Sequence, residues 1–556
     1  MINKISITVI KGKSRWQLET VPGKNLLSLC KENNIFIDAV CNGMGRCGKC
    51  VVITEKDMFP VTTADLTYIS KKDLDMGYRL ACRVMLKESC TIQIPDNMEQ
   101  ITSDSEIRQD DIQDTETSTY GIAIDIGTTT IGAALIDIQD SKVVGQKSLL
   151  NHQRVYGADV ISRIAASLET EDGTDAINES NLIKMRRSIL TDIADTINDL
   201  MAGRKGYVRQ IVIAGNTTML HLLRGYNCEG LGSYPYTPVT LDAESLTLND
   251  LYDAEDSKAF IDSYKTLAGN NNSCRQDTAV FIMPGISVFV GADIVSGMYS
   301  LGFGDDKSTS NIFMLDMGTN GEMAFKSGDH IYVASTAAGP VFEGGGISCG
   351  TGSIPGAVSH ISINTDEKGG ISTQIETING LTPTGICGTG VLELVSELVR
   401  NGIIDKTGLL SDEFFDTGYV FATNRSQTFA MTQSDIRQVQ LAKAAIRSGI
   451  EILISESAGV SADNIDKVYI AGGFGREVRP DAIRALQMLP QDIDSDKIYS
   501  PGNTSLSGCI KFIMNTAVNG IATEIDKVKK IAGMSTEVIL AGLDEFDDTY
   551  YEYLDF

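Results

Sequence analysis

The sequence predicts an α/β protein in three parts: a small N-terminal domain, an acidic linker and a larger duplicated α/β domain. Three observations support this division. A loop with three closely spaced cysteines lies near the N-terminus, a run of acidic and hydroxyl residues follows, and a strand–turn–strand pattern then occurs twice. We expect the parts to span residues 1–97 and 98–119, with two further halves at 120–300 and 301–556.

Composition and charge limit the possible functions. The chain has 556 residues, 42% of them hydrophobic, which is enough for several globular domains. The net charge of −26 argues against nucleic-acid partners and anionic membrane surfaces, which attract basic proteins. The first residues lack the apolar core of a signal peptide, and the most apolar run, 279–290, contains Pro284 and is too short to span a bilayer. We therefore expect a cytoplasmic protein with no membrane or nucleic-acid partner.

Four cysteines form the most specific pattern in the chain. Three of them lie in CNGMGRCGKC and the fourth in YRLACRV, at positions Cys41, Cys47, Cys50 and Cys82. The spacing C-x5-C-x2-C-x31-C lets three thiolates from one loop and a fourth from a distant segment hold a [2Fe–2S] cluster. Zinc would usually require two C-x2-C pairs, and disulfides are typical of small secreted domains, so both alternatives are disfavoured.

The patterns around these cysteines predict a small mixed domain. Residues 5–12 and 14–21 predict a hairpin, residues 26–31 a helix, and a strand is expected to begin at Cys50. Glycines tolerate positive φ and add no bulk, so the loop can wrap closely around a cluster. The loop glycines are Gly43, Gly45 and Gly48. Together these features resemble the β-grasp fold of plant- and adrenodoxin-type ferredoxins over the first 97 residues.

Residues 101–119 differ in character from both neighbouring parts. They include six acidic residues, one arginine, many Ser and Thr, and no aromatic residue. Such a segment cannot bury enough apolar surface to offset its loss of conformational entropy on ordering. We predict a flexible, self-repelling tether that lets the cluster domain move between partners.

Two copies of a strand–turn–strand unit dominate the rest of the chain, and each is followed by a strand ending in Ala-Gly. The first unit surrounds the DIGTTT sequence that begins at Asp125, and the second surrounds the DMGTNG sequence that begins at Asp316. The glycines of turn and strand end are 88 residues apart in the first copy (127 to 215) and 154 in the second (318 to 472). The sequence therefore predicts an internal duplication with an enlarged second copy.

The two turns have the chemistry of a phosphate site. Their backbone N–H groups and hydroxyls can contact phosphate oxygens, and the carboxylates of Asp125 and Asp316 can hold a Mg²⁺-bound water. Two such turns facing each other would bind a triphosphate from both sides. The candidate phosphate contacts are Gly127, Thr128, Thr129, Gly318, Thr319 and Asn320, and the candidate adenosine contacts are Gly472 and Gly473.

Three further segments are candidates for the same site. Residues 334–358 and 383–399 are glycine-rich and each predict a loop that opens a helix, which either binds an anion at free N–H groups or reflects tight helix packing. Asp293 is predicted at a helix start, where a carboxylate either caps the helix or polarises water.

The order of these motifs resembles the phosphate-1, phosphate-2 and adenosine motifs of the acetate and sugar kinase/Hsp70/actin (ASKHA) superfamily. The resemblance implies that ATP and Mg²⁺ bind at these residues. It also implies a catalytic role for Asp293, which occupies a position similar to a GxD aspartate of sugar kinases.

A ferredoxin module joined to an ASKHA ATPase resembles the reductive activators of corrinoid-dependent methyltransferases and corrinoid proteins. The similar segments include the AGNTTMLHLL, DMGTNGE and ASTAAGPVFEGGGI sequences. The resemblance implies ATP-dependent, one-electron reduction of Co(II) to Co(I) in a corrinoid protein or a corrinoid methyltransferase component. It also implies a low-potential electron donor of unknown identity, and a homodimer is one possible assembly.

Three other functions stay open at the level of sequence. The first is a small-molecule kinase with a fused electron-transfer domain, for which no substrate pocket is identifiable. The second is an activator of another low-potential metalloenzyme; the 2-hydroxyacyl-CoA dehydratase activators are also ASKHA proteins but lack this ferredoxin domain. The third is a redox-binding module with a degenerate ATPase half, against which the two intact turns argue.

Overall fold

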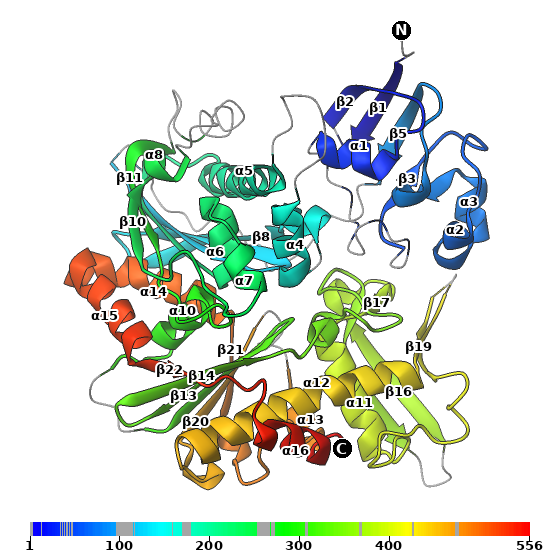
Figure 1. Ribbon diagram of the computed structural model, residues 1–556. Coiled ribbons are helices and arrows are strands. Elements are labelled where there is room, and N and C mark those ends of the chain that lie inside the picture. Colours follow the sequence, from blue (N-terminus) through cyan, green and yellow to red (C-terminus); the bar gives the residue numbers. More distant parts are fainter. Residues whose placement is uncertain are drawn as a thin grey trace.

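The computed structural model describes three sheet-containing parts, and Figure 1 shows the small N-terminal domain beside the first of two larger sheets, with the second large sheet below. The described residues are 4–12, 14–33, 35, 37, 39, 43, 45, 48–95, 115, 117–157, 159–169, 180–252, 267, 273–305, 310–365, 370–424, 427–472 and 478–556.

The N-terminal domain is a five-stranded sheet of order β2-β1-β5-β3-β4 packed on helix α1. β1 pairs antiparallel with β2 and parallel with β5, as in the predicted β-grasp fold, which is confirmed. Alternate residues of β1, Ile7 and Val9, are fully buried against Leu26 of α1. The elements are β1 (Ile5–Lys11), β2 (Ser14–Thr20), α1 (Leu26–Glu32), β3 (Val51–Ile53), α2 (Thr63–Tyr68), α3 (Lys71–Asp75), β4 (Tyr78–Leu80) and β5 (Cys90–Ile94).

The first large sheet has the order β10-β11-β9-β6-β7-β8. β6, β7 and β8 form an antiparallel meander, while β9 runs parallel to β6 and β11 parallel to β9. The strands are β6 (Thr119–Ile126), β7 (Thr130–Asp137), β8 (Lys142–Leu150), β9 (Tyr207–Gly215), β10 (Glu244–Thr247) and β11 (Cys274–Ile282). The helical segments of this half are η3 (His152–Tyr156), α4 (Val160–Leu168), α5 (Asn181–Met201), α6 (Thr217–Arg224), α7 (Glu229–Gly232) and α8 (Leu248–Tyr252).

The second large sheet repeats this arrangement, with the order β21-β20-β12-β13-β14-β22. β12, β13 and β14 form the meander, and β20 runs parallel to β12 as β9 does to β6. The predicted internal duplication is therefore confirmed at the level of topology. The strands are β12 (Ile312–Met317), β13 (Gly321–Ser327), β14 (His330–Thr336), β20 (Lys467–Ala471), β21 (Ile498–Gly502) and β22 (Ser535–Glu537).

The second copy is enlarged by a subdomain inserted between β14 and β20. It contains β15 (Ala357–Thr365), β16 (Ile371–Thr377), β17 (Gly385–Ile386), α11 (Gly388–Arg400), β18 (Tyr419–Thr423), β19 (Thr428–Met431) and α12 (Gln433–Glu451). Shorter helices α13 (Pro480–Ala485) and α16 (Asp544–Glu552) complete the half. Within the described ranges, no helix combines the length and apolar character needed to cross a bilayer.

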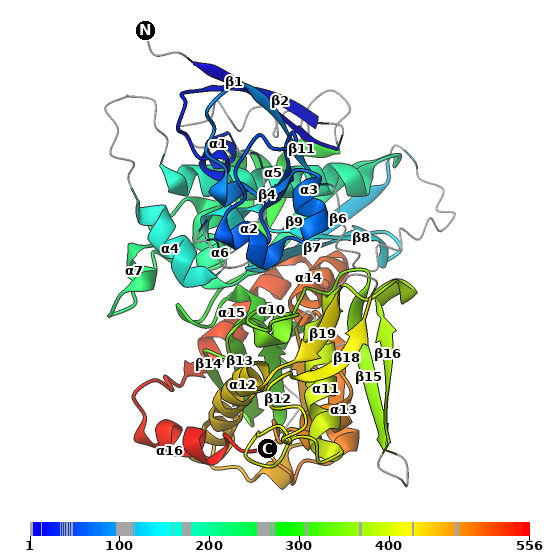
Figure 2. The same ribbon diagram turned by 90° about the vertical axis from the view of Figure 1, so that its right-hand side faces the viewer.

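Three helices lie between the two large sheets, as both views show (Figures 1 and 2): α10 (Ala292–Ser300), α14 (Thr504–Asn519) and α15 (Ile521–Met534). Although α14 directly follows β21 of the second sheet in sequence, it packs on β6 and β9 of the first. Phe512 of α14 stacks on Phe281 of β11 with ring centroids 4.7 Å apart. A Cβ atom at position 508 would lie 2.0 Å from the carbonyl oxygen of Ser296, so only glycine allows α10 and α14 to cross this closely.

One of the two glycine-rich stretches does not open the helix that was predicted for it. The glycine-rich stretch 334–358 was expected to open a helix, but it leads through a short 3₁₀ turn, η4 (Pro340–Glu343), into strand β15, because the positive φ of Gly339, Gly344 and Gly346 is incompatible with a continuous helix. The stretch 383–399 does open a helix, α11.

The predicted tether lies outside the described residues except at its C-terminal end, where Ser118 is buried and Thr119 already begins β6.

Candidate iron–sulfur and nucleotide sites

Two of the four predicted cluster ligands lie next to each other. Cys50 directly precedes β3, and Cys82 lies in the 3₁₀ turn after β4. The hydrogen bond from the Cys50 side chain is the main cause that lowers the pKa of Cys82 to about 7, and the nearby charge of Arg83 acts in the same direction. Cys41 and Cys47 lie outside the described residues, so their role as ligands stays a prediction.

Asn25 ties the Cys82 turn to the helix packed on the sheet. Its Oδ1 caps α1 by accepting from the N–H of Ser28. Its Nδ2 donates to the carbonyl oxygens of Cys82, at 3.1 Å, and Val84, at 3.3 Å. The position of Cys82 is thus fixed by backbone contacts that do not depend on a bound cluster.

The described glycines of the cysteine loop are needed for its close approach to Cys82. Gly43, Gly45 and Gly48 have φ of +80°, +74° and +68°. A Cβ atom at Gly45 would lie 2.1 Å from the guanidinium of Arg83, and one at Gly48 would lie 2.6 Å from Cβ of Tyr68. The loop therefore lies against the segment that contains Cys82, and the residues present fit a thiolate-held cluster.

The other buried cysteines of this domain have a different electrostatic character. Burial is the main cause that raises the pKa of Cys30 to about 12 and that of Cys90 to about 11. Both thiols pack in the hydrophobic core. Both therefore have the character of small apolar core residues, and the choice of Cys82 as the fourth ligand stays a prediction.

The first phosphate turn joins β6 to β7 and is held by side chains from three separate segments. Asn151 Nδ2 donates to the carbonyl oxygen of Gly127 at 2.9 Å, and the buried Arg163 donates to that of Thr128. Asn216, the N-cap of α6, donates to the hydroxyl of Thr128 at 3.0 Å. Side chains from outside the turn therefore hold its backbone in place without a bound nucleotide.

The second turn joins β12 to β13 and has the same internal closure. The N–H of Gly318 donates to the carbonyl oxygen of Asn320 at 3.0 Å, as that of Gly127 does to Thr130 at 2.9 Å. These two glycine N–H groups are consequently used inside the turns. The N–H groups that find no acceptor among the described residues, and are free for phosphate oxygens, belong to Thr128, Thr129, Thr319 and Asn320.

A glutamate that the sequence analysis did not single out joins the two turns. Thr129 Oγ1 donates to Oε2 of Glu343 at 2.8 Å, and Thr319 Oγ1 donates to Oε1 of the same residue at 3.1 Å. This shared partner shows that the two turns face each other, as predicted. In the sequence, Glu343 lies in the ASTAAGPVFEGGGI segment, but nothing in that segment alone indicates its role.

The three predicted catalytic aspartates lie within electrostatic reach of one another. Burial is the main cause that raises the pKa of Asp293 to about 8 and that of Asp316 to about 7, and the charge of Asp125 is the next cause for both. Glu322, which pairs with Asp316 across β12 and β13, also has a raised pKa for these reasons. Asp293 lies in the first turn of α10, whose N-cap is Gly291, so it is not the helix cap.

Asp125 is oriented by the start of α14. Asn503 Nδ2 and Ser505 Oγ each donate to its carboxylate at 2.7 Å. The pKa of Asp125 is raised by burial, and these two hydrogen bonds oppose that rise. Sequence reasoning could not find Asn503 and Ser505, because they lie in a different half of the chain from the turn that they hold.

Strand β20, whose end is the candidate adenosine contact, ends beside the second turn. Gly472 has φ of +113°, and a Cβ atom there would lie 2.4 Å from the carbonyl oxygen of Met317 and 3.2 Å from Oδ1 of Asp316. Glycine is therefore required at this strand end, which closely approaches the phosphate turn. Gly473 lies outside the described residues, and its contact with adenosine stays a prediction.

No group of three or more His, Cys, Asp or Glu side chains within the described residues is arranged to ligate a metal ion directly. The crowded carboxylates nevertheless suit a hydrated divalent cation. Mg²⁺ usually keeps several waters and binds through one or two carboxylates together with substrate phosphates. A cation that arrives with ATP would offset the repulsion among Asp125, Asp293 and Asp316.

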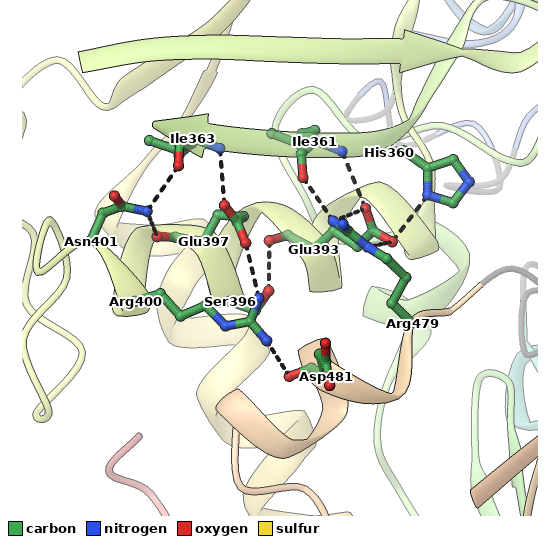
Figure 3. Close-up of polar contacts among 10 residues, drawn as sticks. All are labelled: His360, Ile361, Ile363, Glu393, Ser396, Glu397, Arg400, Asn401, Arg479 and Asp481. Atoms are coloured by element: carbon green, nitrogen blue, oxygen red, sulfur yellow. Dashed lines mark hydrogen bonds and ion pairs between the residues drawn. The ribbon is translucent and has the colours of Figure 1, made fainter. Parts of the chain in front are cut away.

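A network of hydrogen bonds and ion pairs anchors β15 to α11 (Figure 3). The buried carboxylate of Glu393 accepts from the N–H of Ile361 at 3.2 Å and from Arg479 at 2.7 Å and 2.8 Å. One turn later, Glu397 accepts from the N–H of Ile363 at 2.9 Å. Two carboxylates of one helix thus satisfy N–H groups of β15 that lie beyond its pairing with β17, which covers Ala357 and Val358.

We expect Glu393→Ala to destabilise the C-terminal half by about 1–3 kcal/mol, because an unpaired buried polar group costs that much. Burial raises the pKa of Glu393, but hydrogen bonds from His360 and Arg479 outweigh it and hold the pKa below the ordinary 4.5. The stabilisation is therefore present above pH 4.5 and is lost as the pH falls through the lowered pKa. The free energies of unfolding of wild type and Glu393→Ala, measured in urea, should differ at pH 7 and become equal at acidic pH. Because Glu376 is exposed, Glu376→Ala should have the wild-type free energy of unfolding at every pH.

The fold and the two sites define an iron–sulfur protein with a duplicated ASKHA nucleotide-binding domain. Residues 9–87 match the family described as 2Fe-2S iron-sulfur cluster binding domain. Residues 120–270 match the RACo middle region, and residues 310–556 match the C-terminal domain of RACo, the ASKHA domain. The chain belongs to the RACo family of reductive activators of corrinoid proteins.

Similar proteins support this assignment. The corrinoid activation enzyme RamQ of Eubacterium limosum is 31% identical over 451 residues, which cover 78% of this chain and 69% of RamQ. The [Co(II) methylated amine-specific corrinoid protein] reductase of Methanosarcina barkeri is 25% identical, with 78% and 76% covered. A solved structure of a reductive activator for a corrinoid, iron–sulfur protein has a TM-score of 0.66 and 25% identity, with 99% of this chain and 98% of that chain covered.

Proposed function

We infer that this protein is an ATP-dependent reductive activator of a corrinoid protein, which it returns from inactive Co(II) to Co(I) by a one-electron reduction. The observation that carries this function is the combination, in one chain of this family, of a cysteine site fitted to a [2Fe–2S] cluster and two facing phosphate turns. The cluster, when bound, supplies the electron.

The need for ATP follows from the energetics of the reduction. A plant-type [2Fe–2S] centre has a potential of about −400 mV, and reduction of a Co(II) corrinoid from such a centre is uphill. ATP binding can assist this reduction only by favouring a conformation of the protein that binds the Co(II) partner with a different affinity. The shift in conformational equilibrium is limited by the difference in binding free energy between the two conformations.

The residues of the two turns supply the ATP site in this proposal. The free N–H groups of Thr128 and Thr319 bind phosphate oxygens, and the hydrogen bond from Asn216 helps to hold Thr128 in position. Asp125 and Asp316 hold the waters of a Mg²⁺ ion, with Asp293 beside them. Gly472 lets the nucleotide approach the end of β20, and the predicted Gly473 extends that surface.

The electron donor, the type of corrinoid partner, the cellular location and the assembly are also part of this proposal. A low-potential donor reduces the cluster, and the corrinoid partner is a methyl-carrier protein or a methyltransferase component. A reducing cytoplasm suits the chain, because no disulfide joins any two of the nine cysteines in the described residues. A homodimer is compatible with the function, which does not require one.

The decisive test is an anaerobic assay with a Co(II) corrinoid protein, a low-potential reductant and MgATP, followed by Co(I) absorbance. We expect Co(I) to form only when protein, reductant and ATP are all present. Release of inorganic phosphate without formation of a phosphorylated small molecule would distinguish this function from that of a kinase. Equal Co(I) formation with and without ATP would contradict the proposal.

A second prediction concerns linkage between the two ligands. ATP should change the affinity for the Co(II) partner, and the partner should change ATP affinity by the same factor, because coupling free energies are reciprocal. A coupling of 5–150-fold is the usual range, about 1–3 kcal/mol. Titration of the Co(II) partner with and without a non-hydrolysable ATP analogue measures it. No change in either affinity or Co(II) spectrum would rule out the conformational route.

A further inference from the structure

Glu343 has an unusual position, because each of its carboxylate oxygens is bound by a different phosphate turn. Oε2 accepts from Thr129 at 2.8 Å and Oε1 accepts from Thr319 at 3.1 Å. Oε1 would also lie 3.2 Å from a Cβ atom at Gly318, so the carboxylate lies directly against the second turn. One side chain thus spans the space between the two turns.

The backbone holds this glutamate in place. Val341 and Phe342 of η4 are buried in the core of the C-terminal half, and the N–H of Gly344 closes the turn on the carbonyl oxygen of Val341 at 3.0 Å. A Cβ atom at Gly388, the first residue of α11, would lie 1.8 Å from the carbonyl oxygen of Phe342. This close packing leaves the side chain of Glu343, rather than its backbone, as the part that can move.

The carboxylate and an ATP phosphate compete for the same donors. The hydroxyls of Thr129 and Thr319 belong to the turns that bind phosphate in the proposed function, and a hydroxyl has only one hydrogen to donate. The negative charge of the Glu343 carboxylate and that of a phosphate bound to the same turns would also repel each other. Phosphate entry must therefore release the hydroxyls from Glu343 and leave its carboxylate unpaired beside the terminal phosphate.

We propose that Glu343 is the residue that positions and deprotonates the water that attacks ATP, and that it links the two turns while the site is empty. This inference rests on the proposed ATPase function and assigns its water-positioning residue. The water oxygen forms a bond to the γ-phosphorus as the bond to the β,γ-bridging oxygen breaks. The water proton passes to Glu343 and then to the released phosphate or to solvent. ADP keeps the bridging oxygen.

The test is Glu343→Gln in the full-length holoprotein, with Glu376→Gln as the matched control because Glu376 is exposed on β16 of the same half. Glutamine keeps the shape and can still hydrogen-bond both hydroxyls, but it is neutral and cannot take a proton. We expect single-turnover hydrolysis to fall by about 10²–10⁴-fold, the usual contribution of a general base. Binding of a non-hydrolysable ATP analogue should be unchanged or tighter, since a negative charge beside the phosphates is removed.

Each outcome of this test has a definite meaning. Wild-type hydrolysis by Glu343→Gln overturns the proposal, and so does a parallel loss of nucleotide binding and hydrolysis with normal thermal stability, which would make the residue a structural link only. If Asp293→Asn instead shows the loss of hydrolysis with retained binding while Glu343→Gln does not, the water belongs to Asp293. Failure of the wild-type protein to bind or hydrolyse MgATP would contradict the proposed function itself rather than this assignment.

Discussion

Asp316→Asn should hydrolyse ATP about 10²–10³-fold more slowly than wild type, the loss typical of removing one electrostatic contact to a developing charge. Asp316 ends β12 beside Gly472 and the second phosphate turn, and the charges of Asp125 and Glu343 both act on it. Asparagine keeps the size of the side chain but removes the negative charge that would hold a Mg²⁺-bound water. Steady-state phosphate release measures the loss.

Asp125→Ala should give a loss of similar size for the same reason. This change also leaves Asn503 and Ser505 without their acceptor, so thermal unfolding must be measured beside the rate. Both variants should keep the wild-type visible spectrum of the cluster, which belongs to a different domain. Wild-type rates of hydrolysis in both variants would show that the two turns do not form the ATP site.

Cys82→Ser should lose the cluster and with it all Co(II) reduction, while ATP hydrolysis continues. The hydrogen bond from Cys50 lowers the pKa of the Cys82 thiol to about 7, whereas burial raises the pKa of Cys30 and that of Cys90. A serine hydroxyl is a far weaker ligand than a thiolate, so we expect cluster occupancy to fall at least about tenfold. Iron content, visible absorption and the S = 1/2 EPR signal after reduction measure it.

Cys90→Ser is the matched control, because Cys90 is also buried in the same sheet but lies on β5. We expect it to keep the cluster. Loss of the cluster from Cys90→Ser with retention in Cys82→Ser would identify Cys90 as the fourth ligand.

Most of the fold could be predicted from the sequence because its signals are local. The strands around Asp125 and Asp316 are apolar runs that end in a tight turn, and both occur as expected. The hairpin of the N-terminal domain and the helix after it also follow from residue alternation and periodicity within short segments. Such patterns require no knowledge of the rest of the chain.

The side chains that complete the nucleotide site could not be predicted, because their partners are distant in sequence. Glu343 lies 214 residues from Thr129, and Asn503 lies 378 residues from Asp125. A carboxylate after a proline and a helix-capping asparagine are common in loops, so neither has a local signature of function. The glycine-rich stretch that contains Glu343 was expected to open a helix, and the positive φ of Gly344 and Gly346, which ends η4 after one turn, could not be read from the glycines alone.

The dependence of Asp125 on α14 has a consequence for synthesis of the protein. The first phosphate turn leaves the ribosome early, but the side chains that orient its aspartate, Asn503 and Ser505, are among the last to be translated. A nascent chain that contains only the first half therefore cannot assemble a complete ATP site. Because translation proceeds at about 5–20 residues per second, the 378 residues between these partners delay completion by tens of seconds. The ferredoxin domain, whose sheet and core are formed by β1 to β5 and the segments between them, can fold throughout that interval, so a newly made molecule is able to acquire iron before it is able to use ATP.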